Sequence, residues 1–273
     1  MAGDATARLL PFPSVTFEDV RVGEAEEPLV VADRFSMDAE LAPFLSGEIL
    51  IFDMRVENPT ITLELDERGL PVWDLSDNGP VSPAQVTLES ATISNATMVL
   101  HDRVAGRSWR MEGLDATVSA ESLYGPFRIT GDGTLNGTPL GFRINTGTLS
   151  KDGFSLRTAV DLPGQGIELS VDGRVAEPET ADAAPYNGTF TMRPREATPE
   201  TRYTVEGGFA ASPRSFEVAD YRAEFGATDD PYVVTGSAGI SGGADPSYHV
   251  EIKGTQVTLA EEAAGEQPAG GGP

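Results

Sequence analysis

The chain alternates apolar and polar residues with a period of two along most of its 273 residues. Residues 61–65, 140–144 and 167–171 each place an apolar side chain at every second position, with polar residues or glycine between. Because successive side chains of a β-strand point to opposite faces, each of these segments has one apolar and one polar face. A long series of such segments predicts an extended sheet with one polar, solvent-facing side and one apolar side.

Turn residues divide the pattern into many short strands. The 30 glycines and 20 prolines supply turn signals about every ten residues, a spacing that is typical of an all-β chain. We therefore predict an all-β protein built as an elongated, curved and mostly antiparallel sheet. Within it, the segments 85–89, 91–95 and 97–102 are expected to be three separate strands.

One short helix is predicted near residues 38–45. Asp38 is the expected N-cap residue, and Gly47 is expected just beyond the C-terminal end. Pro43 limits the helix to about two turns, because proline disrupts a helix interior.

Shifts in the apolar parity near Asp19 and Asp53 indicate bulges or bends in two strands. Gly131, Gly133 and Gly173 lie within strand patterns, where glycine often marks a bend or a close approach of the backbone. The sheet is therefore expected to curve.

We divide the chain into three regions. Residues 1–124 form a first part of the sheet, and residues 125–259 add further strands to the same sheet after a Gly-Pro break. Residues 260–273 have the composition of a disordered tail or of the start of a linker.

Composition excludes several function classes. With 43 acidic and 19 basic residues the formal net charge is -24, and no basic stretch is present, so nucleic-acid binding is not expected. The absence of cysteine excludes disulfides, thiolate chemistry and cysteine-ligated metals. No run of ~18 apolar residues predicts a membrane-spanning helix. The N-terminal residues lack the apolar core of a signal peptide.

Two sequence patterns suggest catalysis, and we interpret both as structural. Gly239–Gly243 matches Gly-x-Ser-x-Gly around Ser241, but the pattern requires a following helix, and His249 lies only eight residues further, on an expected strand. Glu64 and Asp66 share a strand face, as paired carboxylates of a glycosidase could, but charges on a wet face explain them.

The two histidines predict no metal site. His101 and Asp102 form one possible ligand pair, for which a turn at the end of a strand is the better interpretation. The sequence thus predicts no catalytic residue, no metal and no cofactor.

An ordered series of motifs resembles the AsmA family. It begins with residues 10–23, continues with 41–49 and 58–66, and reaches 69–73, where Val72 stands at the position of the family's Asn before Trp. The segments 92–102, 123–127 and 137–140 are also similar, so that the resemblance covers roughly residues 10–175.

The resemblance implies a non-enzymatic protein of the Gram-negative envelope. AsmA-like proteins are anchored in the inner membrane and project a β-groove into the periplasm, where they support phospholipid transport and outer-membrane assembly. For this chain it implies a periplasmic location, an inner-membrane anchor outside the given sequence, and phospholipid acyl chains as the ligand.

The residues expected to line the groove are those on the apolar parity of successive strands. An apolar trough removes the cost of exposing acyl chains to water, about 0.8 kcal/mol per CH₂. The predicted lining residues are Val15, Phe17, Ile61, Leu63, Leu65, Ile93, Leu140, Phe142, Ile144, Ile167 and Leu169.

Two other classes remain open at this point. A structural or adhesive β-solenoid would show the same alternation around a closed, dry core. An enzyme acting on polysaccharide would need a cleft lined by carboxylates. The shape of the apolar face distinguishes the three classes: an open groove, a closed core or a cleft lined by carboxylates.

Overall fold

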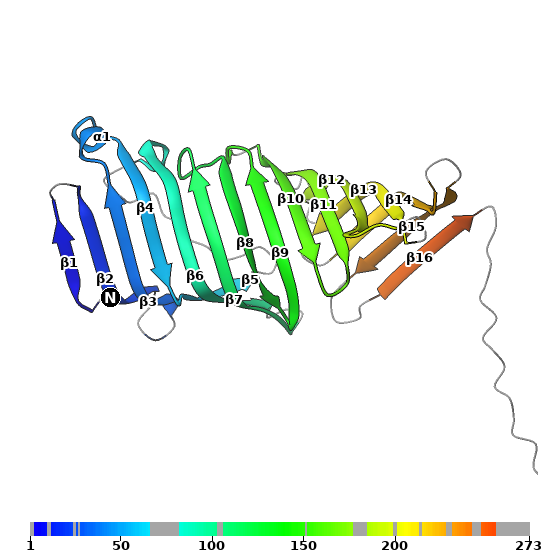
Figure 1. Ribbon diagram of the computed structural model, residues 1–273, viewed down its shortest axis with the longest axis horizontal. Helices are drawn as coiled ribbons and strands as arrows, with labels where there is room; N and C mark the ends of the chain where they lie inside the picture. Colours follow the sequence, from blue (N-terminus) through cyan, green and yellow to red (C-terminus); the bar gives the residue numbers. More distant parts are fainter. Residues whose placement is uncertain are drawn as a thin grey trace, which may run out of the picture.

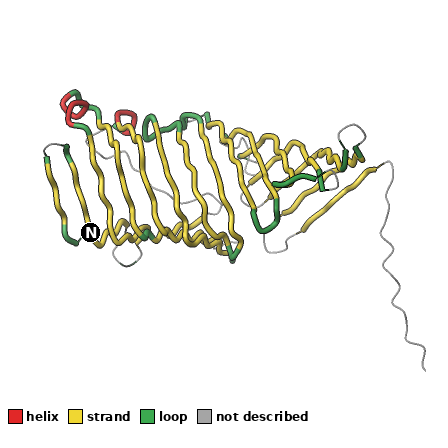
Figure 2. Tube along the Cα trace, viewed as in Figure 1, coloured by secondary structure: helices red, strands yellow, loops and turns green. Residues whose placement is uncertain are grey.

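The computed structural model forms one long sheet with its strands lying across the long axis of the molecule (Figure 1). The residues that it describes are 3–9, 12–23, 26, 28–65, 82–102, 106–150, 152–176, 185–198, 201–212, 215–227, 231–241 and 247–254. Turns and the helix α1 (Leu41–Leu45) lie along the two long edges of this sheet (Figure 2).

Sixteen strands make up the described sheet. In chain order they are β1 (Ala5–Arg8), β2 (Ser14–Gly23), β3 (Pro28–Ala39), β4 (Ile49–Glu57), β5 (Thr60–Leu65), β6 (Val86–Asp102), β7 (Arg107–Ala120), β8 (Phe127–Leu135), β9 (Thr138–Thr146), β10 (Phe154–Leu162), β11 (Ile167–Val175), β12 (Tyr186–Pro194), β13 (Tyr203–Ser212), β14 (Ser215–Phe225), β15 (Tyr232–Ser241) and β16 (Ser247–Gly254). A short 3₁₀ turn, Pro83–Gln85, precedes β6.

Neighbours along the chain are neighbours in the sheet almost throughout. From β6 to β16 each strand pairs antiparallel with the next, and the pairing of β7 with β8 joins the first two regions predicted from the sequence. The exceptions are β4 and β5, which both pair parallel with the long strand β6. The predicted all-β, mostly antiparallel fold with one short helix is confirmed.

Two details of the prediction are wrong. Asp38 does not cap the helix, because β3 continues to Ala39 and Asp38 pairs with Ser14 on one side and with Asp53 on the other. The three strands expected between residues 85 and 102 are one 17-residue strand, β6. The expected glycine beyond the helix is observed, since Gly47 has a φ of 86°.

A line of left-handed residues crosses the first part of the sheet. Asp19, Asn58, Asn95 and Gly113 have φ angles between 50° and 57°. The strand register places Asp33 between Asp19 and Asn58 and places Asn58 beside Asn95, and Leu114, which follows Gly113, pairs with Ala96, which follows Asn95. In β2, β6 and β7 the apolar parity changes at this point, which inserts one residue and bends the strand. We call this line, together with Asp33 of β3, the crease. In Figure 1 the sheet bends along its lower edge, where β5 lies.

Side-chain amides hold the crease together. Asn58 Nδ2 donates to Asp33 Oδ2 at 2.8 Å, and Asn95 Nδ2 donates to Asn58 Oδ1 at 2.8 Å. The backbone N–H of Asn95 donates to Asp115 Oδ1 at 2.8 Å. Asparagine suits these positions because its short polar side chain tolerates the left-handed conformation and hydrogen-bonds locally. The bend predicted near Asp19 is thus one part of the crease, which spans several strands.

The predicted bulge near Asp53 is also observed. The pairing of β3 with β4 shifts register between Asp38 and Ala39, opposite Ile51 and Asp53. This bulge lies next to the first of two buried clusters, which is formed by Ile51, Val86, Leu88, Ala91 and Ala120. The second cluster, Ala96, Leu114 and Ala116, lies at the crease.

Candidate functional site

The pairing register shows that one face of the sheet is apolar from end to end. Residues directly opposite each other in neighbouring strands project to the same face, so a row of pairs can be followed across the sheet. One such row passes through every strand except β5. It consists of Ala5, Phe17, Phe35, Val56, Ile93, Ala116, Gly131, Phe142, Val160, Leu169, Met192, Val205, Ala223, Val234 and Gly254.

The adjacent row projects to the opposite face and is almost entirely polar. It consists of Thr6, Thr16, Ser36, Arg55, Thr92, Thr117, Thr130, Arg143, Ala159, Ser170, Thr191, Glu206, Arg222, Thr235 and Lys253. Each residue of this row is the chain neighbour of a residue in the apolar row. The segregation predicted within single strands therefore extends over the whole sheet.

All eleven residues predicted to line a groove lie on this apolar face. Phe17, Ile93, Phe142 and Leu169 belong to the apolar row itself. The other seven pair with residues of the same face, for example Ile144 with Ile129. Ten of the eleven side chains are half-buried, and only Leu65 is buried.

The sequence analysis missed a set of methionines on the same face. Their partners are mostly apolar: Met37 pairs with Met54, and Met98 pairs with Met111. Met192 lies in the apolar row. Methionine is flexible and polarisable, and it adapts to irregular apolar ligands. Parity within each strand could have identified these residues.

The apolar face lies on the inner side of the crease. The second cluster contains Ala116 from one side of the bend and Ala96 from the other, and Ile93, Met98 and Met111 pack against it. Side chains on both sides of a bend can meet only on its inner face. Asp102, which is 1% exposed and pairs with Leu65, is the single buried charged residue in the described part of this face.

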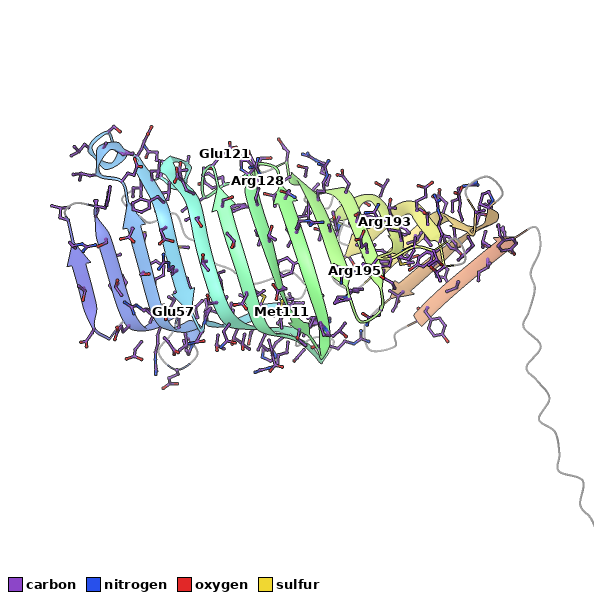
Figure 3. The ribbon with its side chains drawn as sticks, in the orientation of Figure 1. Glu57, Met111, Glu121, Arg128, Arg193 and Arg195 are labelled. Carbon is purple, nitrogen blue, oxygen red and sulfur yellow. The ribbon has the colours of Figure 1, made fainter. Side chains whose placement is uncertain are left out.

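Charged side chains stand along the margins of the sheet. Glu121 and Arg128 lie near one long edge, and Glu57 lies near the other, on which the uncharged Met111 is also seen (Figure 3). On the polar face, ion pairs join neighbouring strands, such as Arg157 Nη2 to Asp172 Oδ2 at 2.6 Å. These groups are largely exposed, so each pair contributes little to stability.

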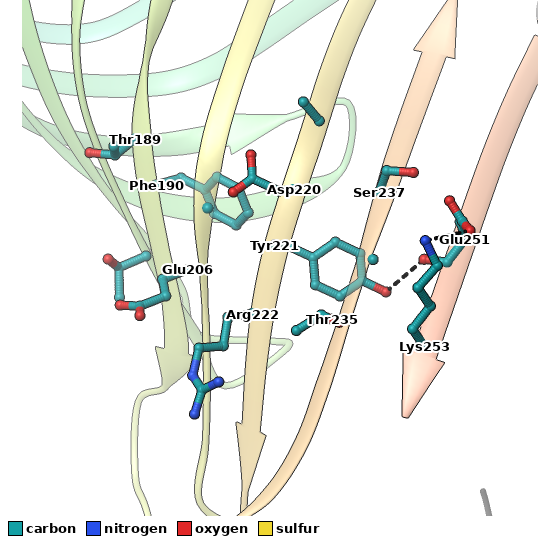
Figure 4. A pocket seen from close by; sticks show the side chains of 14 residues that line it. Thr189, Phe190, Glu206, Asp220, Tyr221, Arg222, Thr235, Ser237, Glu251 and Lys253 are labelled. Atoms are coloured by element: carbon teal, nitrogen blue, oxygen red, sulfur yellow. Dashed lines mark hydrogen bonds and ion pairs between the residues drawn. The ribbon is translucent and has the colours of Figure 1, made fainter. Parts of the chain in front are cut away.

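Two hollows, of about 690 and 340 Å³, lie on the polar face of β9–β16 and share Thr189 and Thr191. The lining of the larger one includes Tyr221, which pairs with Gly207 and Gly236 of the apolar face, and the Tyr221 hydroxyl donates to the carbonyl of Glu251 on β16 at 3.3 Å (Figure 4). The Lys253 ammonium, 2.9 Å from Glu251 Oε1, hydrogen-bonds that carboxylate and lowers its pKa. The lining carries salt-bridged charges of both signs, including Arg222.

Ser241 and His249 do not form a nucleophile and base pair. Ser241 is the last residue of β15, and its hydroxyl lies 3.2 Å from the hydroxyl of Ser247 on β16. His249 pairs with Gly239, and its Nε2 lies 3.8 Å from Glu217 Oε2. Both residues therefore lie on the polar face of the sheet, where β15 pairs with β16.

The other candidate ligands also separate. His101 and Asp102 are consecutive in β6 and point to opposite faces, and His101 Nδ1 lies 2.8 Å from the Ser108 hydroxyl. Glu64 pairs with His101 in β5, whereas Asp66 lies outside the described residues. In the part of the chain that the structure describes, no group of three or more potential ligands is arranged to hold a metal ion.

Searches against protein-family models, curated proteins and solved structures found no match to this chain. The described residues contain no helix that is long and apolar enough to cross a membrane.

Proposed function

We propose that this chain is an AsmA-like region of the Gram-negative envelope that holds or conducts phospholipid acyl chains along its apolar face. It works without catalysis, in the periplasm, and is held at the inner membrane by an anchor outside residues 1–273. Its role is to support lipid transport between the membranes and the assembly of the outer membrane.

The observation that carries the proposal is the unbroken apolar row through fifteen of the sixteen described strands. Fourteen apolar residues are buried among the described part of the chain, and half of them are alanines. The larger apolar side chains, such as Phe142 and Leu169, remain half-buried. An apolar face of this length with side chains still partly accessible is suited to an elongated apolar ligand.

The energetics favour such a ligand. Exposing the two acyl chains of a phospholipid to water costs on the order of 20 kcal/mol of free energy, at about 0.8 kcal/mol per CH₂. Neighbouring strands lie ~4.8 Å apart, so a row across fifteen strands is several times longer than one acyl chain. The site needs only apolar surface along its length, since the chemistry of the lipid does not change.

The topology favours an open sheet over the alternative of a structural solenoid. A β-solenoid stacks parallel coils around a closed core, whereas the described strands from β6 to β16 form an antiparallel meander in one sheet. Only β4 and β5 pair in parallel, both with β6.

The test places a charge on each face of one strand. Leu169→Asp changes the apolar row on β11, and Ser170→Asp changes the polar row one residue away. Phe142 is less suitable, because it packs against the buried cluster at the crease and a charge there also tests folding. Leu169 belongs to neither buried cluster, so the carboxylate of the Leu169→Asp variant can reach water at modest cost.

Phospholipid that co-purifies with the chain is measured by mass spectrometry, and binding of a fluorescent phospholipid is measured by titration. We expect wild type and Ser170→Asp to bind lipid, and Leu169→Asp to lose most of it while its melting temperature stays within a few degrees. If wild type binds no phospholipid, or if the two variants bind equally, the proposal fails. If Leu169→Asp unfolds, Leu169 belongs to an ordinary closed core, and the result supports the alternative of a structural solenoid.

A further inference from the structure

The two ends of the sheet differ in how they terminate. At one end β1 has four residues, and only Ala5 and Ala7 of this strand lie on the apolar face. At the other end β16 has eight residues, and within the described residues its outer edge pairs with no strand. Natural sheets usually shorten or charge their edges to prevent pairing with another chain. The β1 edge is short, whereas the β16 edge is long.

The side chains of β16 continue the two faces of the sheet to its last strand. Tyr248, Val250 and Ile252 are 84%, 63% and 63% exposed and pair with Ile240, Ala238 and Gly236 of the apolar face. The charged residues of β16 all lie on the polar face, and none interrupts the apolar side. Such an edge presents unpaired backbone groups and a row of apolar side chains.

We propose that β16 pairs antiparallel with β16 of a second copy of this chain, around a two-fold axis at Val250. In this register Val250 faces its own copy and Tyr248 faces Ile252, so only apolar residues meet on the apolar face. On the polar face His249 meets Glu251 of the second copy, and Ser247 meets Lys253. The pairing is self-complementary in both polarity and charge, and it keeps the apolar faces of both copies on the same side.

The neighbouring registers that preserve the faces are less favourable. An axis at Glu251 places two carboxylates opposite each other, and like charges directly opposite destabilise a sheet. An axis at His249 places two imidazoles opposite each other and removes the contact between His249 and Glu251. An axis at Ile252 places Glu251 opposite Lys253, but it aligns only residues 250–254 of the described strand, whereas the axis at Val250 aligns residues 247–253. The charge pattern and the length of the pairing together therefore select Val250.

Consequently, two copies would form one continuous sheet with an apolar face of twice the length. The inference rests on the edge strand alone and is independent of what the apolar face binds. Its test is the state of association, which is measured without lipid.

The chain has no cysteine, so a single substitution introduces a unique thiol. Val250→Cys places the two thiols directly opposite each other, within the Cα separation that a disulfide needs. Ile252→Cys is the matched control, because each copy of residue 252 faces Tyr248 and the two thiols lie apart. Under mild oxidation we expect a covalent dimer for Val250→Cys and none for Ile252→Cys.

A second pair of variants tests association without crosslinking. Val250→Lys places two ammonium groups opposite each other, while His249→Lys places an ammonium opposite Glu251. In sedimentation velocity we expect dimers for wild type and His249→Lys, and monomers for Val250→Lys, with unchanged circular dichroism. Val250 is largely exposed, so a lysine at this position does not disturb the fold. Monomeric wild type at all concentrations, equal crosslinking of the two cysteine variants, or open-ended filaments would overturn the proposal.

Discussion

The creased region, β2–β7, and the plain meander, β8–β16, use the same alternating sequence and yet bury side chains to very different extents. Eleven of the fourteen buried apolar residues in the described part of the chain lie at or before Ala120, and only Phe209, Val218 and Ala223 lie beyond it. Both buried clusters are in the creased region, with partly buried Phe127 and Phe142 packed against them. The apolar face is therefore buried mainly in the creased region, where one of the two clusters lies at the crease itself.

The meander is held together differently. Its apolar face combines glycines with aromatic rings from the neighbouring strand: Phe190 pairs with Gly207, and Phe209 pairs with Gly188. Aromatic rings also meet, as in the pair Tyr186 and Phe209, with centroids 4.8 Å apart. Burial raises the pKa of Tyr186, and the nearby charge of Asp172 raises it further. A Cβ on Gly207 would lie 3.1 Å from Phe190 Cε1, so the ring occupies the space above this glycine.

The largest expected effect is the removal of a buried side chain in the creased region. Leu88→Ala deletes a side chain of the first cluster, and we expect it to lower the free energy of unfolding by roughly 2–5 kcal/mol. Ile240→Ala, in the meander at 54% exposure, is the matched control and should cost less than about 1 kcal/mol. Urea denaturation measures both. Equal losses would show that the two regions are packed alike.

A smaller effect is expected where the two regions meet. A Cβ on Gly131 would lie 2.5 Å from the backbone carbonyl oxygen of Asp115 and 3.0 Å from both Ala116 Cβ and Phe142 Cζ, whereas the nearest atoms to a Cβ on Gly141 would be 3.9 Å away. Gly131→Ala should therefore destabilise by about 1–3 kcal/mol through overpacking. Gly141→Ala, on the polar face of the adjacent strand, should be neutral within about 0.5 kcal/mol. Thermal unfolding of the two variants shows whether the close approach of the β7 backbone and of the apolar side chains restricts residue 131 to glycine.

The smallest effect concerns the crease itself. Asn95→Ala removes the hydrogen bond to Asn58 and forces alanine into a left-handed conformation, so we expect a loss of about 1–2 kcal/mol. Asn95→Gly removes the same hydrogen bond but tolerates the conformation, and it should cost less. Comparison of the two melting temperatures separates the backbone contribution from the side-chain contribution. If the alanine variant is as stable as the glycine variant or more stable, the left-handed φ angle of residue 95 carries no cost and the prediction is wrong.

Much of the candidate face could be read from local patterns. The parity of Ile61, Leu63 and Leu65 identifies one side of one strand, and the same is true of each predicted segment. Parity within a strand does not say whether the apolar sides of two neighbouring strands lie on the same face of the sheet. That relation depends on the register, and the structure aligns all eleven predicted residues on one face.

Other features lie beyond local patterns because they depend on pairing between distant segments. The end of β3 is an example: Asp38 has the residue type of a helix cap, but ladders to Ser14 and Asp53 on its two sides keep it in a strand. The parallel pairing of β4 and β5 with β6 likewise joins segments that are separated along the chain.

The sequence by itself determined the class of fold, the polarity of each strand and the site of the helix, because alternation and turn chemistry act over a few neighbouring residues. Only the tertiary structure decided that the parity shifts of β2, β6 and β7 meet in one crease, and that the apolar sides form one continuous face. Both depend on backbone hydrogen bonds between strands, whose register is set jointly by all the strands of the sheet.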